Sequence, residues 1–207
     1  MGDFSKLNLF SAPPITQTNE KCMKKILPPL LLTALLILPA VLFAGLSFFG
    51  ERHPLEKRVV EGVPFLENSG NQVEVVFFGY AGCSFICPNA LIKAAGAMDS
   101  LRTERPGISA GITFVDINAQ TQLNRAETYG KSFSNDIRGI NTDAELLEKL
   151  KKDFSLRIKS DPVNPYDIDH TDHFYILNKK EGKWRISRVL ANISDKKTLE
   201  HAIISAL

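Results

Sequence analysis

Two cysteines lie four positions apart in the stretch GYAGCSFICP, at Cys83 and Cys87. The stretch follows an apolar run and precedes a segment with helical periodicity, so both thiols fall near the start of a helix. A helix N-terminus stabilises negative charge and favours thiolates, which are the nucleophiles of redox chemistry and the ligands of soft metals. Residues at this spacing can face each other at a Cα separation on the order of 6 Å, which a disulfide tolerates. The spacing leaves open a structural disulfide, a redox couple and part of a metal site.

A metal site would need a further donor, and two histidines occur together in DIDHTDHFYIL, at His170 and His173. Two thiolates and one imidazole form a three-coordinate set that suits soft Cu(I). Structural zinc would require a fourth ligand, for which Asp169 and His173 are the nearby candidates. Asp169 could alternatively orient His170 by accepting a hydrogen bond.

The segments before and after the two thiols have the sequence patterns of a strand and a helix. Residues 73–80 form a nearly continuous apolar run, which is typical of a buried central strand, and Pro88 fits the first turn of a helix. A capping-box pattern beginning at Thr142 opens another helix, and two apolar runs joined by NKKEGK predict a hairpin. The predicted strands are 73–80, 112–117, 173–177 and 184–190, with a short apolar piece at 137–140, and the predicted helices are 88–101, 122–133, 142–154 and 195–207.

Strands that alternate with helices and end in a hairpin plus a helix predict an α/β sandwich with a mixed central sheet. Because a cysteine pair occupies the first strand–helix junction, the specific expectation is a thioredoxin-like fold. In such a sheet the segment entering strand 173–177 passes beside the cysteine-bearing loop, which would bring His170 to the thiols. His173 is expected to pack or hydrogen-bond at the sheet edge.

Length and charge narrow the class of protein. The 207 residues have room for one ordinary domain plus accessory segments. The 25 basic and 23 acidic residues give a net charge of +2, without a basic cluster beside aromatic residues, and this argues against a nucleic-acid-binding protein. Three cysteines are too few for a disulfide scaffold, so the pair at 83 and 87 is expected to serve chemistry.

An apolar segment near the N-terminus predicts a membrane helix. No charged residue occurs between Ile26 and Gly50, and a helix crosses a bilayer with roughly 20 residues. Lysines at positions 21, 24 and 25 precede the segment, so the positive-inside rule places the N-terminus in the cytoplasm. A cleaved signal peptide beginning at Met23 is the alternative. The predicted organisation is a short cytoplasmic tail over 1–22, an anchor over 23–50 and an exported domain over 51–207.

With these residues the chain resembles the Sco/SenC family, whose members are membrane-anchored, thioredoxin-fold copper proteins that help to assemble cytochrome c oxidase. The resemblance covers roughly residues 57–190 and is carried by VVFFGYAGCSFICPNAL, FVDI, Y…F…IRGI and DIDHT…YIL. The family's copper ligands are its two motif cysteines and the histidine of Asp-His-Ser/Thr, which fall on Cys83, Cys87 and His170. The family often reads Val-Asp-Pro-x-Arg-Asp-Thr after its second strand, whereas residues 115–121 here read VDINAQT and lack the arginine and the second aspartate.

The resemblance implies a copper metallochaperone rather than an enzyme, held in the inner membrane by a single span with its C-terminal domain in the periplasm. Its partner would be the copper-bearing subunit of cytochrome c oxidase or another copper chaperone. In an exported compartment the two thiols are also expected to close into a disulfide, which cannot hold copper. A thiol–disulfide oxidoreductase that uses Cys83 and Cys87 without metal is the main alternative. A structural or sensory domain with a disulfide is a third.

Overall fold

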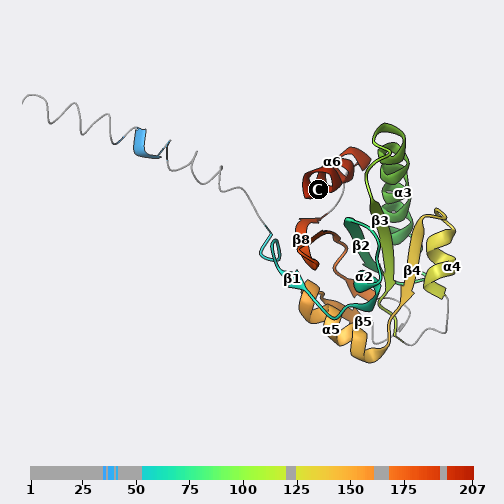
Figure 1. Ribbon diagram of the computed structural model, residues 1–207. Coiled ribbons are helices and arrows are strands. Elements are labelled where there is room, and N and C mark those ends of the chain that lie inside the picture. Colours follow the sequence, from blue (N-terminus) through green and yellow to red (C-terminus); the bar gives the residue numbers. More distant parts are fainter. Residues whose placement is uncertain are drawn as a thin grey trace, which may run out of the picture. The chain divides into compact units, whose positions relative to one another are not determined.

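The computed structural model describes residues 53–119, 125–160, 168–191 and 195–207, together with helical residues at 35, 37–39 and 41 (Figure 1). The chain divides into two units, residues 1–52 and residues 53–207. The predicted membrane segment at 26–50 falls mostly outside the described residues. Within the part of the chain that is described, no helix combines the length and the apolar character needed to cross a membrane.

A six-stranded mixed sheet runs through the unit at 53–207, in the order β1-β8-β7-β2-β3-β4. Strands β2, β3 and β4 are parallel, whereas β7 pairs antiparallel with β2, β8 with β7, and β1 with β8. The strands are β1 (Val59–Val60), β2 (Val73–Gly79), β3 (Ala110–Asp116), β4 (Ile137–Asn141), β7 (Phe174–Lys180) and β8 (Lys183–Leu190). This arrangement confirms the predicted mixed α/β fold.

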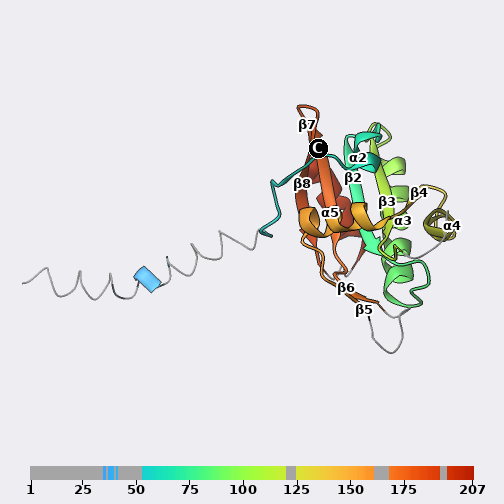
Figure 2. The ribbon, with the colours of Figure 1, turned by 90° about the horizontal axis from the view of Figure 1, so that it is seen from below.

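Helices cover both faces of this sheet (Figures 1 and 2). On one face α3 and α6 pack over Val75 and Phe77, and on the other α2 and α5 pack over Val76 and Phe78. Successive strand residues point to opposite faces, so β2 must be apolar at nearly every position to be covered on both. The helices are α2 (Pro64–Glu67), α3 (Ile86–Glu104), α4 (Arg125–Lys131), α5 (Ala144–Phe154) and α6 (Lys196–Ala206).

Several predicted boundaries differ from those observed. Helix α3 starts two residues earlier than predicted, so Cys87 lies within its first turn. The cap of α5 is Asp143, whose side chain accepts a hydrogen bond from the Leu146 amide; the predicted cap, Thr142, instead donates to the Asp116 carbonyl of β3. A turn of two residues, Glu181 and Gly182, joins β7 to β8. Both residues adopt positive φ (55° and 76°), as a tight hairpin turn of this length requires.

The sequence patterns did not predict β1, α2 or a separate antiparallel ribbon formed by β5 (Ile158–Ser160) and β6 (Ile168–His170). These elements have two to four residues each, too few to display a period. Thr171 ties the ribbon together, because its amide donates to the Arg157 carbonyl and its hydroxyl accepts from the Arg157 amide, each at 3.0 Å. The ribbon matters for function because it carries His170.

Buried polar side chains lie at the amino-terminal ends of the parallel strands, far along β2 from the cysteines. Glu74 of β2 is 1% exposed, and its carboxylate accepts hydrogen bonds from Ser69, Asn71 and Thr113. Arg138 of β4 completes the group at 3.4 Å from the carboxylate. We call these five residues the Glu74 cluster. Its acceptor atoms are paired, as burial of a charge requires.

Candidate metal centre

The loop between β2 and α3 begins with a tight turn that presents Cys83. The Cys83 amide donates to the Tyr80 carbonyl at 3.1 Å, which closes the turn. Gly82 within it has φ +133°, a conformation that residues with a side chain rarely adopt. A Cβ at Gly82 would also lie 3.0 Å from the Arg125 guanidinium. Glycine is therefore needed at position 82 to form the turn that orients Cys83.

Cys87, in the first turn of α3, is completely buried, and its sulfur packs against the end of β2. A Cβ added to Gly79 would lie 2.7 Å from the Cys87 sulfur and 3.0 Å from the Phe114 ring. The absence of a side chain at Gly79 therefore creates the space that the sulfur occupies. Cys83, in contrast, retains 9% exposure.

The two thiols are free and have opposite electrostatic environments. Burial disfavours ionisation of Cys83, yet hydrogen bonds from the amides of Cys87, Phe85 and Ile86 hold the pKa of its thiol below the ordinary value. The Cys87 amide lies 3.4 Å from the Cys83 sulfur. Burial, with the nearby charges of Cys83 and Asp116, raises the pKa of the Cys87 thiol. The helix start therefore favours one thiolate, at Cys83.

His170 lines the same hollow as Cys83. The hollow has a volume of about 360 Å³ and is lined by Tyr80, Cys83, Ser84, Phe85, Ile86, Ile168, Asp169 and His170. The His170 Nδ1 lies 2.9 Å from the Thr171 carbonyl, which can only accept a hydrogen bond, so this contact assigns the donor role to Nδ1 and leaves Nε2 as the nitrogen that a metal would use. The imidazole stands edge-on to the Tyr80 ring at a centroid distance of 6.0 Å.

The three predicted ligands thus meet at one place in the fold, although not at coordination distance. Cys83 and His170 line the same hollow, and Cys87 lies behind Cys83. In the described ranges, no three histidine, cysteine or acidic side chains are close enough together to hold a metal ion. The donor types nevertheless fit a soft metal, because Cys83 and His170 line the hollow and Cys87 is buried next to Cys83.

His173 and Asp169 are the other two candidate ligands, and only Asp169 borders the hollow that contains Cys83. His173 packs edge-on to His53 at a centroid distance of 5.8 Å and beside Tyr175 at 6.2 Å, and burial lowers its pKa. It lines a second cavity of about 500 Å³, which His170 also borders, and does not line the hollow with Cys83. Asp169 is exposed and borders both spaces.

Tyr129 of α4 also holds the cysteine loop, and sequence reasoning assigned it no role. Its hydroxyl donates to the Cys83 carbonyl at 2.7 Å, and its ring packs against Phe114 and Phe133. Burial, together with the charges of Cys87 and Cys83, raises the pKa of Tyr129, so the hydroxyl keeps its proton and remains a donor. The only available signal was its place in the Y…F…IRGI pattern.

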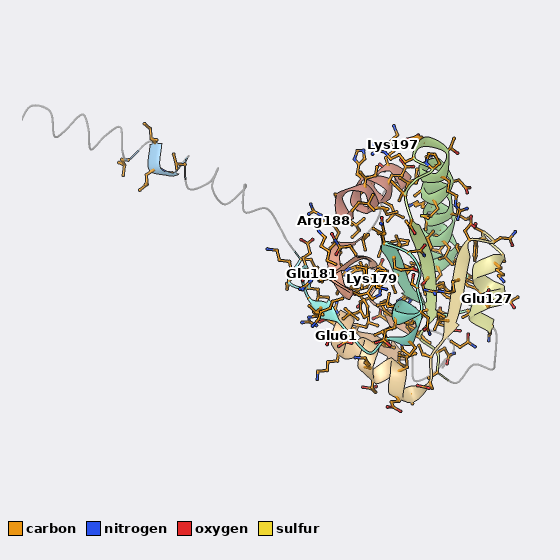
Figure 3. The ribbon with its side chains drawn as sticks, in the orientation of Figure 1. Glu61, Glu127, Lys179, Glu181, Arg188 and Lys197 are labelled. Atoms are coloured by element: carbon orange, nitrogen blue, oxygen red, sulfur yellow. The ribbon has the colours of Figure 1, made fainter. Side chains whose placement is uncertain are left out.

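Close packing between α4 and β4 brings Tyr129 to the loop. A Cβ at Gly139 would lie 2.1–2.2 Å from the backbone of Ala126 and Glu127, so the helix can approach only a glycine. The Glu127 carboxylate, on the outer helix in Figure 3, accepts the Gly139 amide at 2.7 Å. Hydrogen bonds from Lys131 and Gly139 hold the pKa of Glu127 below its ordinary value.

The model of the SCO1/SenC family matches residues 67–206. The chain belongs to the SCO1/SenC family. Among curated relatives of this SCO1/SenC protein is the mitochondrial SCO1 homolog 1 of Arabidopsis thaliana, 23% identical over 125 residues. That match takes in 59% of the present chain and 36% of the relative, so it spans little more than a third of the relative's length.

Solved structures of Sco proteins share the fold of this SCO1/SenC domain. The copper-bound ScoI of A. thaliana gives a TM-score of 0.58 at 19% identity, covering 66% of this chain and 84% of that one. Apo Sco1 of Thermus thermophilus gives 0.57 at 19% identity, covering 76% and 94%. Copper-bound yeast Sco1 gives 0.54 at 23% identity, covering 65% and 75%. The mixed sheet is therefore that of the thioredoxin-like Sco structures.

Proposed function

We propose that this protein is a copper metallochaperone that binds copper through Cys83, Cys87 and His170 and assists assembly of the copper centre of cytochrome c oxidase. The observation that carries the proposal is the hollow that Cys83 shares with His170, with the Cys87 sulfur buried behind it. Membership of the SCO1/SenC family supports it, and two structures with the same fold are described as copper-bound.

Each of the three residues has a separate part in holding the copper cargo. Cys83 supplies the thiolate that the helix start already favours, whereas Cys87 must lose a proton that burial retains. Cu(I) is a soft ion and would compensate the second deprotonation by bonding to sulfur. His170 would offer Nε2, because its Nδ1 is engaged by the Thr171 carbonyl. Since the donors in the described ranges are not close enough together to hold a metal ion, we expect the β5–β6 ribbon to move toward the thiols on loading.

We further propose that the domain lies in the periplasm, anchored in the inner membrane through the apolar segment at 26–50. A reporter fused after Leu207 should be active only if it functions outside the cytoplasm. Recovery of a soluble form beginning near Gly45 would instead support a cleaved signal peptide.

The ligand assignment is tested on the full chain, reduced and loaded anaerobically. Substitution His170→Ala should weaken Cu(I) binding without abolishing it, because Cu(I) is stable with two sulfurs, and should remove the specific Cu(II) site, which favours nitrogen. His173→Ala is the matched control, since it lines the other cavity, and should bind both ions like the parent. If His173→Ala lost copper while His170→Ala kept it, the assignment would be wrong.

A thiol–disulfide oxidoreductase is the second candidate, and the asymmetry of the two thiols favours it. The Cys83 thiolate could attack a partner's disulfide, forming a mixed disulfide and releasing one partner thiolate. Cys87 would then attack the Cys83 sulfur, releasing the second partner thiolate and leaving a Cys83–Cys87 disulfide. This cycle needs no imidazole. If His170→Ala reduced a disulfide substrate at the parental rate and neither protein bound copper, the second candidate would replace the first.

A further inference from the structure

Exposed apolar side chains gather beside the thiols. Over the described ranges of 53–207, the large apolar side chains that are exposed are Phe85 (75%), Ile86 (49%), Ile92 (59%) and Leu207 (50%). The first three, which we call the apolar rim, lie at the cap and in the first two turns of α3. Single exposed apolar residues are ordinary, but such a group beside a functional site indicates an interaction surface.

The rim stands between two hollows. Phe85 and Ile86 line the 360 Å³ hollow that contains Cys83 and His170. The same two residues also line a neighbouring hollow of about 300 Å³, together with Asn89, Ala90, Lys93, Asp172 and Phe174. Ile92 is seven residues beyond Phe85, so it extends the rim along the same side of the helix. A partner lying on the rim would therefore reach both hollows.

The position of the thiols determines what must lie on the rim during copper exchange. Cys87 is fully buried and Cys83 nearly so, which leaves the hollow bordered by Phe85 and Ile86 as the route to the sulfurs. A protein that accepts copper must bring its own donor atom within bonding distance of the ion in that hollow. Because Phe85 and Ile86 border the hollow and are exposed, a segment that enters the hollow on their side would cover both side chains.

We infer that the apolar rim is the docking surface for the copper-accepting protein. This inference rests on the proposed function and adds the chemistry of the partner. The accepting segment carries a soft donor, the side chain of Cys, Met or His, that enters the hollow at Cys83. An adjacent apolar side chain of the same segment enters the 300 Å³ hollow against Phe174. Burial of the rim in the complex removes apolar surface from water and holds the two metal sites together.

The test compares copper transfer to a protein with copper transfer to a small molecule. The full chain, with Cu(I) bound, is mixed with the reduced apo copper-bearing domain of cytochrome c oxidase, or with a soluble Cu(I) chelator. The variants are Ile92→Gln and Phe85→Gln, and Leu207→Gln is the matched control because Leu207 is an exposed apolar residue outside the rim. Transfer to the protein acceptor should slow about five- to tenfold in the rim variants, as for interface anchor residues, and remain parental in the control.

Further measurements decide what covers the rim. Ile92→Gln should leave both Cu(I) affinity and transfer to the chelator unchanged, because Ile92 does not line the hollow that contains Cys83 and the chelator needs no docking surface. Equal transfer to the protein acceptor by parent and rim variants would overturn the docking surface while leaving the copper function standing. Parent protein that binds copper but never transfers it to the acceptor would overturn both. Loss of a dimer, or of binding to anionic vesicles, in the rim variants with unchanged transfer would assign the rim to a second copy or to the membrane.

Discussion

Polar groups are buried at both ends of the parallel strands, but the two ends differ in how fully these groups are hydrogen-bonded. At the amino-terminal end, the Glu74 carboxylate accepts from Ser69, Asn71 and Thr113 and pairs with Arg138. At the carboxyl-terminal end, the Cys83 sulfur receives backbone amides from one side and faces a hollow on the other. A fully paired buried group contributes to one rigid structure, whereas a partly satisfied group can exchange partners. The first end is therefore suited to stability and the second to binding.

The largest effect is expected at the binding end. The double substitution Cys83→Ser with Cys87→Ser should abolish Cu(I) binding, because it removes both sulfur donors and leaves a single imidazole. The unfolding free energy should fall by about 1–3 kcal/mol, because a polar hydroxyl replaces the completely buried Cys87 sulfur. Metal analysis and thermal denaturation of the full chain measure the two quantities. Retained stoichiometric copper would place the ligands elsewhere in the chain.

The next effect is expected at the opposite end. Arg138→Met leaves the buried Glu74 charge unpaired and should lower the unfolding free energy by about 3 kcal/mol. That is the low end of the usual range, because the Arg138 side chain remains 35% exposed. Adding Glu74→Gln removes the unpaired charge and should recover most of the loss. Denaturant unfolding measures stability, and Cu(I) affinity of the folded variants should stay parental. A large loss of affinity would show that the two ends are coupled.

Gly79→Ala tests the space behind the thiols. The new methyl group would press on the Cys87 sulfur at 2.7 Å and on Phe114 at 3.0 Å, so the sulfur must move. We expect a loss of about 1–3 kcal/mol in stability, typical of overpacking, together with weaker Cu(I) binding. Gly107→Ala is the matched control, because its added Cβ would meet no atom within 4 Å. Unaltered copper affinity in the Gly79 variant would mean that the position of Cys87 is not critical.

The pKa difference between the thiols predicts a pH-dependent difference in alkylation. The thiolate is the reactive form, so a lowered pKa preserves the reactivity of Cys83 at lower pH. In a Cys22→Ser background, Cys83 should react with iodoacetamide more than about tenfold faster than Cys87 at neutral pH. Its rate should reach half of its maximum below the ordinary thiol pKa of about 8.5. Mass spectrometry of the reduced apo protein follows both sites, and identical profiles would contradict the assigned asymmetry.

The smallest effect is expected for Tyr129→Phe, which removes the hydrogen bond to the Cys83 carbonyl and keeps the ring. Stability should fall by about 1 kcal/mol, the usual contribution of such a bond, and copper should dissociate a few times faster. Tyr175→Phe is the matched control, because its hydroxyl donates to the Phe154 carbonyl at 3.0 Å on the other face of the sheet. It should lose similar stability with parental copper dissociation. Equal dissociation rates in the two variants would leave Tyr129 without a positioning role.

The elements that position the site could largely be predicted from the sequence. The apolar run at 73–80 became β2, and the periodic segment after Cys87 became α3, because local patterns report which side chains are buried. The cysteine pair accordingly lies at the junction of strand and helix. The ligand role of His170 came from the family motif and stays a prediction.

Other features depended on contacts between distant segments. The sequence alone determined a mixed α/β sheet with two thiols at a helix start and a histidine on the segment entering a later strand. The tertiary structure decided that Tyr129 bonds to Cys83 across 46 positions, that Gly79 makes room for the Cys87 sulfur, and that Asp143 rather than Thr142 caps α5. Periodicity records burial along one element, but a hydrogen bond or a steric gap between elements exists only after they have packed.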